Sequence, residues 1–306
     1  MKKERKKRLL KKIRTKWKYI IAIVPSLFLF TLFNVYPNLS VFPLSLYDWS
    51  PIRSSKEFVG LRNFKMSFVI NQDRTMKLIT NTITYVLTLF IIQTVFSLIL
   101  ALALQKNTRK NIFFRTYFFL PKVFSAAMVG LTWQFMYDPN LGIINNILGM
   151  LGVDGYPGKY LFQGSFISVM LVVIVHIWAN IGYPIMYIMS GISTIPGELH
   201  EAAMLDGANG WDRFLHITFP LLIPTLSRLS LLTLTTGVLA ADYTVLLGGA
   251  ANGQAVTLSS YIYEQTRTGM EYGIVSALSV LLFFILGILS IIQFTGMRKV
   301  EKSVLG

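Results

Sequence analysis

Long apolar stretches constrain this chain more than any other feature of its sequence. They cover residues 19–40, 79–104, 117–137, 166–190, 219–247 and 273–295. Each stretch exceeds the roughly 18 apolar residues that indicate a membrane-spanning helix, which bonds its own backbone groups within the bilayer. Only 14% of the 306 residues are charged, against about 25% in ordinary soluble domains. We therefore predict an all-α integral membrane protein with six transmembrane helices.

The formal charge of +15 is concentrated at the N-terminus, where eleven basic residues lie between Lys2 and Lys18. This block leads directly into the first apolar stretch, as expected for a cytoplasmic tail facing an anionic leaflet. Its position argues against a nucleic-acid partner. No small-residue cleavage site follows, so we expect the first stretch to be retained as a membrane helix.

Six spans place both termini on one side of the membrane. With a cytoplasmic N-terminus, the inner segments hold 19 Lys and Arg residues and the outer segments hold eight, in agreement with the positive-inside rule. The predicted organisation is a tail (1–18), a first helix (19–40), an outer loop (41–78), a five-helix core (79–295) containing a cytoplasmic loop (191–218), and a second tail (296–306). The outer loop has room for a short amphipathic helix.

The cytoplasmic loop contains the sequence SGISTIPGELHEAAMLDGANGWDRFLHITFPLLIP. Pro196 suits the first position of a helix, and Gly207 suits the residue that ends it in a left-handed conformation. Leu199, Ala202, Ala203 and Asp206 would then share one face, whose small centre lets another backbone approach closely. Composition alone favours an ordinary interfacial helix.

The spacing within this loop closely resembles the EAA loop of binding-protein-dependent ABC transporter permeases. The matching positions are Glu201, Ala202, Ala203, Asp206, Gly207, Ala208, His216, Ile217, Pro220 and Pro224. Phe219 stands where that family usually has leucine. The segments FNVYPNLSVFPLSLYDWSP, FVGLRNF and SSYIYEQ resemble the carbohydrate-importer branch, which includes maltose, glycerol-phosphate and multiple-sugar permeases. Ala250 replaces the proline of a Gly-Gly-Pro turn usual in that branch.

The resemblance implies a type I, MetI-like permease fold in the cytoplasmic membrane of a prokaryote. It implies four kinds of protein and ligand partner: a second permease, two ATP-binding-cassette ATPases, an extracytoplasmic solute-binding protein and a carbohydrate. It also implies that ATP and Mg bind the ATPases, that this chain holds no cofactor and is not an enzyme, and that the EAA positions from Glu201 to Ala208 couple it to the ATPase.

The residues themselves offer no site for catalysis or for a cofactor. The chain lacks the Gly-x-x-x-x-Gly-Lys-Ser/Thr phosphate loop and contains no cysteine. His176, His200 and His216 are not spaced with carboxylates as a metal site requires, and we expect them to be structural.

Polar groups within the apolar stretches indicate a substrate path, because ionisable groups at membrane depth tend to face a cavity or a partner. Asp242, followed by Tyr243, is placed to accept hydrogen bonds from sugar hydroxyls, although it also suits the watery outer interface. Trp178, Asn180 and Tyr183 lie beside Gly182 and Pro184, which can interrupt a helix. A simple kink within an aromatic belt is the alternative. Gln93 and Gln134 are expected to bond between helices.

The sequence thus predicts an alternating-access carbohydrate permease driven by partner ATPases. An ion-coupled secondary transporter is the main alternative and a channel a more distant one; the loop at Glu201 argues against both.

Overall fold

The computed structural model describes residues 23–51, 56–69, 72–138, 140–152, 166–247, 254–268 and 271–305. The basic block 1–18, the start of the first predicted span and the loop around Ala250 lie outside the described residues. The chain divides into two compact units, one holding the residues up to Val69 with 269–280, the other holding 70–268 with the residues from Leu281.

The first unit contains a helix over Ile23–Leu44, in which the π-turn η1 (Thr31–Val35) is followed by α2 (Tyr36–Leu44). Strands β1 (Tyr47–Asp48) and β2 (Glu57–Phe58) pair antiparallel. The amphipathic helix expected in the outer loop is present as α3 (Arg62–Val69). The Asn63 side chain is buried and donates hydrogen bonds to the Ser45 and Tyr47 carbonyls, which fastens α3 to the start of β1 and to the residues before it.

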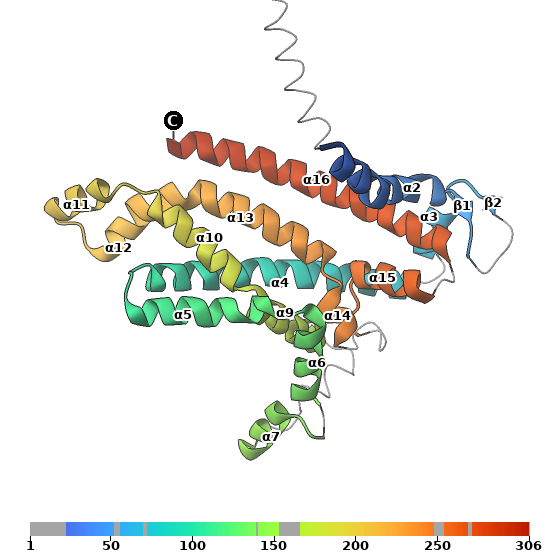
Figure 1. Ribbon diagram of the computed structural model, residues 1–306, viewed down its shortest axis with the longest axis horizontal. Coiled ribbons are helices and arrows are strands. Elements are labelled where there is room, and N and C mark those ends of the chain that lie inside the picture. The colour runs from blue at the N-terminus through green and yellow to red at the C-terminus, as the bar shows by residue number, and fades with distance from the viewer. Residues whose placement is uncertain are drawn as a thin grey trace, which may run out of the picture. The chain divides into compact units, whose positions relative to one another are not determined.

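The second unit is built around α4 (Gln72–Leu104), as Figure 1 shows. The other elements are α5 (Arg109–Phe119), η2 (Leu120–Val123), α6 (Ala126–Met136), α7 (Ile143–Met150), α9 (Phe166–Asn180), α10 (Gly182–Ser193), α11 (Gly197–Leu205), α12 (Gly210–Arg213), η3 (Phe214–Thr218), α13 (Phe219–Leu239), α14 (Asp242–Leu246) and α15 (Leu258–Thr268). Helix α16 (Tyr272–Leu305) contributes its residues from Leu281 onward.

Helix α4 packs against α9, α10 and α13. Tyr85 and Leu89 are fully buried in that contact, whereas Ile83, Ile91 and Val95 of the same helix are more than half exposed. A helix that is apolar on its exposed side as well as its buried side is typical of a membrane span. Four unbroken helices and two bent helix pairs are long and apolar enough to cross a membrane, which gives at most six spans among the described residues.

The third predicted span, 117–137, is not one continuous helix. Arg109–Val123 and Ala126–Met136 meet at 99°. Pro121 lacks the amide that a continuing helix needs, Phe124 is extended, and Ser125 caps the new helix by accepting a hydrogen bond from the Met128 amide. The fourth span is also broken, with 53° between α9 and α10, beside the predicted Gly182 and Pro184.

Side chains fasten the ends of α4. At its C-terminus, the Arg115 guanidinium donates to the Leu104 and Lys106 carbonyls and to Asn107 Oδ1, which closes the turn into α5. Towards its N-terminus, Asn81 Nδ2 donates to the Gln254 and Val256 carbonyls, and Thr82 Oγ1 accepts from the Leu258 amide. These bonds attach the segment before α15 to α4.

Gly182 allows α10 and α5 to approach closely. A Cβ atom there would lie 2.6 Å from Phe119 Cα and 2.7 Å from the Phe118 carbonyl oxygen. Both are backbone atoms, so the helices would have to separate to admit a methyl group.

We expect Gly182→Ala to lower the free energy of unfolding by about 1–3 kcal/mol through overpacking. The measurement is thermal unfolding of the purified chain in detergent. Gly287→Ala is the matched control, because its added Cβ would meet no atom within 4 Å beyond the neighbouring backbone of its own helix, and alanine favours a helix. Equal unfolding midpoints for both variants would contradict the close contact.

Candidate functional site

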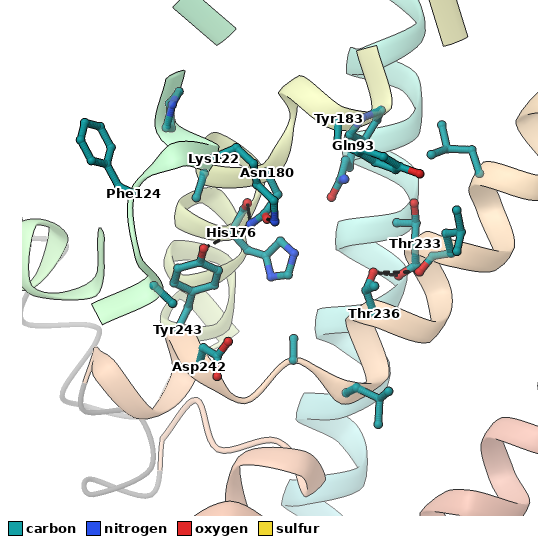
Figure 2. A pocket seen from close by; sticks show the side chains of 18 residues that line it. Gln93, Lys122, Phe124, His176, Asn180, Tyr183, Thr233, Thr236, Asp242 and Tyr243 are labelled. Carbon is teal, nitrogen blue, oxygen red and sulfur yellow. Dashed lines mark hydrogen bonds between the residues drawn. The ribbon is translucent and has the colours of Figure 1, made fainter. Parts of the chain in front are cut away.

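A cavity of about 630 Å³ lies within the second unit. Its size falls in the range of about 300–1,000 Å³ typical of small-molecule sites. The side chains of Figure 2 line it: Gln93, Pro121, Lys122, Phe124, Ala126, His176, Ala179, Asn180, Tyr183, Pro184, Leu229, Leu232, Thr233, Thr236, Leu239, Ala240, Asp242 and Tyr243. Most of the wall area is apolar, but half of the lining residues carry a polar group on the side chain.

Three interruptions of helical structure border this cavity. They are the turn between η2 and α6, the junction of α9 and α10 at Ile181, and the extended Ala240 between α13 and α14. Irregular backbone at membrane depth is tolerated where it lines a polar cavity or is buried in protein. Broken helices around a central site are a recurrent feature of transporters, and here they surround a space large enough for a small molecule.

Asn180 links three of the surrounding elements. Its Oδ1 accepts a hydrogen bond from Lys122 Nζ of η2 at 2.7 Å. Its Nδ2 donates to the His176 carbonyl one turn earlier in α9 at 2.9 Å, and to the Tyr243 hydroxyl of α14 at 3.3 Å. The amide therefore holds the lysine and the tyrosine at the same side of the cavity, as Figure 2 shows.

His176, one turn before Asn180 in α9, contacts two tyrosine side chains. Its Nδ1 is 2.8 Å from the hydroxyl of the buried Tyr85, and its ring packs edge-to-face against Tyr243 with the centroids 5.3 Å apart. A structural role was expected for His176, but its ring also forms part of the cavity wall.

Gln93 is the most unusual of the polar groups. Its side chain is 6% exposed and lines the cavity, and its Oε1 is buried without a hydrogen-bond partner among the described residues. A buried acceptor left unpaired costs about 1–3 kcal/mol. A donor on a bound molecule would remove that cost.

The structure brings four of the five predicted path residues together: Asn180, Tyr183, Asp242 and Tyr243. Trp178 is not among the lining residues; its ring packs edge-to-face on Trp133, with the centroids 5.6 Å apart. Residues two apart on an α-helix point about 200° away from each other, so Trp178 and Asn180 cannot both face the cavity.

Sequence reasoning missed Lys122, His176, Thr233 and Thr236 as lining residues. One signal was available for His176, because it lies four residues before Asn180 and therefore on the same helix face.

The predicted loop helix is present as α11, although Pro196 is its N-cap and Gly197 its first residue. Gly207 has φ +81°, as expected of a residue that ends a helix. The Ala208 amide bonds to the Ala203 carbonyl and the Gly207 amide to the Met204 carbonyl, which together form a Schellman motif.

Helix α11 is largely uncovered in this chain. Glu201, Ala202, Asp206 and Gly207 are exposed, and Ala203 and Ala208 are half-buried. Leu205, at the end of α11, is 89% exposed, and Trp211 of α12 is also exposed. Asn209 and Asp212 form a capping box that starts α12. The loop is therefore an ordered surface with apolar side chains directed to its exterior.

Two helices connect α11 to the cavity. Helix α10 begins at the cavity with Tyr183 and Pro184 and ends just before α11, whereas α13 follows the loop and reaches the cavity from Leu229 onward. The two helices pack closely, since a Cβ added at Gly191 would lie 2.7 Å from the Thr225 side chain. Figure 1 shows α11 and α12 at the far end of this pair from α14.

Known proteins resemble the chain over most of its length. The multiple sugar-binding transport system permease protein MsmF of Streptococcus mutans is 29% identical over 93% of this chain and 96% of its own. The probable ABC transporter permease protein YurN of Bacillus subtilis is 34% identical over 89% and 94%, respectively. The sn-glycerol-3-phosphate transport system permease protein UgpA of Salmonella choleraesuis is 29% identical over 95% and 96%.

Among solved structures, a bacterial ABC transporter involved in the import of the acidic polysaccharide alginate has the same fold. Its matching chain superimposes with a TM-score of 0.81 at 23% identity, covering 95% of this chain and 99% of that one. The family described as "Binding-protein-dependent transport system inner membrane component" matches residues 83–297. The broken helices, the cavity and the exposed α11 thus belong to a multi-pass membrane permease: the chain is a member of the binding-protein-dependent transport system inner membrane component family.

Proposed function

We propose that this chain is the permease subunit of an ATP-binding-cassette importer and carries a carbohydrate across the cytoplasmic membrane by alternating access. The family match over residues 83–297 is the observation that carries the proposal. The names of MsmF and UgpA support a sugar or a polyol derivative as the transported molecule.

In this proposal a second permease pairs with the chain, two ATPase subunits bind ATP and Mg, and a solute-binding protein delivers the sugar from outside. Both termini are cytoplasmic, so that α11 faces the ATPase. Glu201, Ala202, Ala203, Asp206, Gly207 and Ala208 form the coupling surface. Closure of the ATPases displaces α11, and α10 and α13 carry that displacement to the cavity wall.

The substrate path consists of Asn180, Tyr183, Asp242 and Tyr243. These side chains offer an amide, two hydroxyls and a carboxylate, which are suited to the hydroxyl groups of a sugar, and the apolar wall suits its ring faces. Trp178 packs on Trp133, and neither ring is part of the cavity lining.

An ion-coupled secondary transporter remains the alternative to test. Extraction in mild detergent with the neighbouring gene products should recover two ATPase subunits and a second permease. Sugar uptake by the chain alone in liposomes, driven by an ion gradient without ATP, would overturn the proposal.

Asp242→Asn tests the substrate path, because it preserves the shape of the side chain and removes its charge. We expect uptake by the reconstituted complex to fall at least tenfold, since an amide forms weaker hydrogen bonds to sugar hydroxyls than a carboxylate does. Assembly and basal ATPase activity should stay unchanged. Trp178→Ala should have a smaller effect, and full uptake by Asp242→Asn would remove Asp242 from the path.

Gly207→Val tests the coupling surface. A β-branched residue at φ +81° is strained by about 1–3 kcal/mol, so α11 should lose its ordered end and the ATPase subunits should dissociate during purification. Gly207→Asn is the control, because asparagine tolerates the left-handed conformation.

Ala203→Trp should also abolish uptake by adding bulk, whereas Glu201→Ala should leave a partly assembled complex. A stable, fully active Gly207→Val complex would show that α11 only connects its neighbouring helices and does not couple the chain to the ATPase.

A further inference from the structure

We propose that Lys122 makes the cavity selective for a saccharide carrying an anionic group, either a carboxylate or a phosphate. This inference rests on the proposed function and specifies the class of substrate. It assigns a selectivity role to a residue at the break between η2 and α6.

The Lys122 ammonium has a neutral partner. Its Nζ donates to Asn180 Oδ1 at 2.7 Å, and an ammonium carries three donors. In the described part of the chain no carboxylate forms an ion pair with it. Lys122 is exposed and lines the cavity, so its ammonium is accessible to a negatively charged group of a bound molecule.

The start of α6 adds to this preference. Ala126, its first residue, lines the same cavity as Lys122. The Ser125 hydroxyl accepts a hydrogen bond from the Met128 amide. The positive end of the α6 dipole is directed to the same region. The dipole of α6 and the Lys122 ammonium therefore both favour an anion near the start of α6.

Asp242 is the acidic residue of the lining and does not neutralise Lys122. Figure 2 shows the Tyr243 side chain between Asp242 and the pair formed by Lys122 and Asn180. Asp242 is the first residue of α14. The two charges thus occupy separate parts of the cavity.

Gln93 provides independent support for a polar ligand, because its side chain lines the cavity and its buried Oε1 has no hydrogen-bond partner in the described residues. A saccharide hydroxyl can donate to this oxygen and another to Asp242, while an acidic substituent pairs with Lys122. An acidic sugar satisfies all three groups, whereas a neutral sugar leaves the ammonium without an anion.

The test uses the complete complex with its binding protein in proteoliposomes. Uptake is compared for three matched substrates: a neutral oligosaccharide, its uronate counterpart and a sugar phosphate of similar size. The binding protein is the same in every assay, so a change in the ratio between substrates reports on the permease. The two acidic substrates separate a carboxylate from a phosphate as the natural group.

Wild type should favour one of the acidic substrates. Lys122→Met should lower its uptake at least tenfold while leaving uptake of the neutral oligosaccharide unchanged or higher. Lys122→Arg should restore most of the preference. Lys77→Met is the matched control, because Lys77 Nζ bonds to Gln254 Oε1 outside the cavity, and it should keep the wild-type ratio.

Three outcomes would overturn the proposal. If the complex transports neutral sugars and Lys122→Met behaves like Lys77→Met, Lys122 has no selectivity role. The proposed permease function would be unaffected by that result. An equal loss for acidic and neutral substrates would make Lys122 a structural residue. If the assembled complex transports no saccharide at all, the proposed carbohydrate function fails together with this inference.

Discussion

The need to satisfy backbone hydrogen bonds without water governs the second unit. Within the hydrocarbon region only continuous helices meet that need unaided, so each interruption must lie against protein or a polar space. The breaks at Ser125, Ile181 and Ala240 all border one cavity. The cavity and the interruptions therefore depend on each other: the breaks bring polar residues to membrane depth, and the cavity provides the polar surroundings that make the breaks tolerable.

The same helices that border the cavity also border α11. Helix α10 leaves the cavity and reaches the loop within 12 residues, and α13 returns from the loop to the cavity. Gly191 lets the two helices pack against each other at Thr225. Close-packed helices move as units because their interiors have little free volume. A displacement at the exposed surface of α11 thus has a short, stiff route to the cavity wall.

The polar side chains of the cavity gain their positions from one amide. Asn180 bonds simultaneously to Lys122, to the His176 carbonyl and to Tyr243, and so joins η2, α9 and α14. Lys122 and Asp242 remain apart in this arrangement. The cavity consequently presents a cation and a carboxylate at different places, with an unpaired acceptor on Gln93.

Local features of the sequence determined much of this protein. The apolar stretches predicted the helical membrane class, Gly182 and Pro184 predicted the break in the fourth span, and the Gly207 conformation followed from its place at the end of the predicted loop helix. The sequence also predicted Asn180, Tyr183, Asp242 and Tyr243 as candidates, because polar groups are conspicuous in apolar helices.

Only the tertiary structure decided that the third span bends by 99°, that Trp178 faces away from Asn180, and that Lys122 and Asn180, 58 residues apart, form one site. The reason is physical: α4 and its neighbours are apolar on both their lipid-facing and their protein-facing sides, so hydrophobic patterning does not show which face meets which helix, and close packing alone selects the contacts.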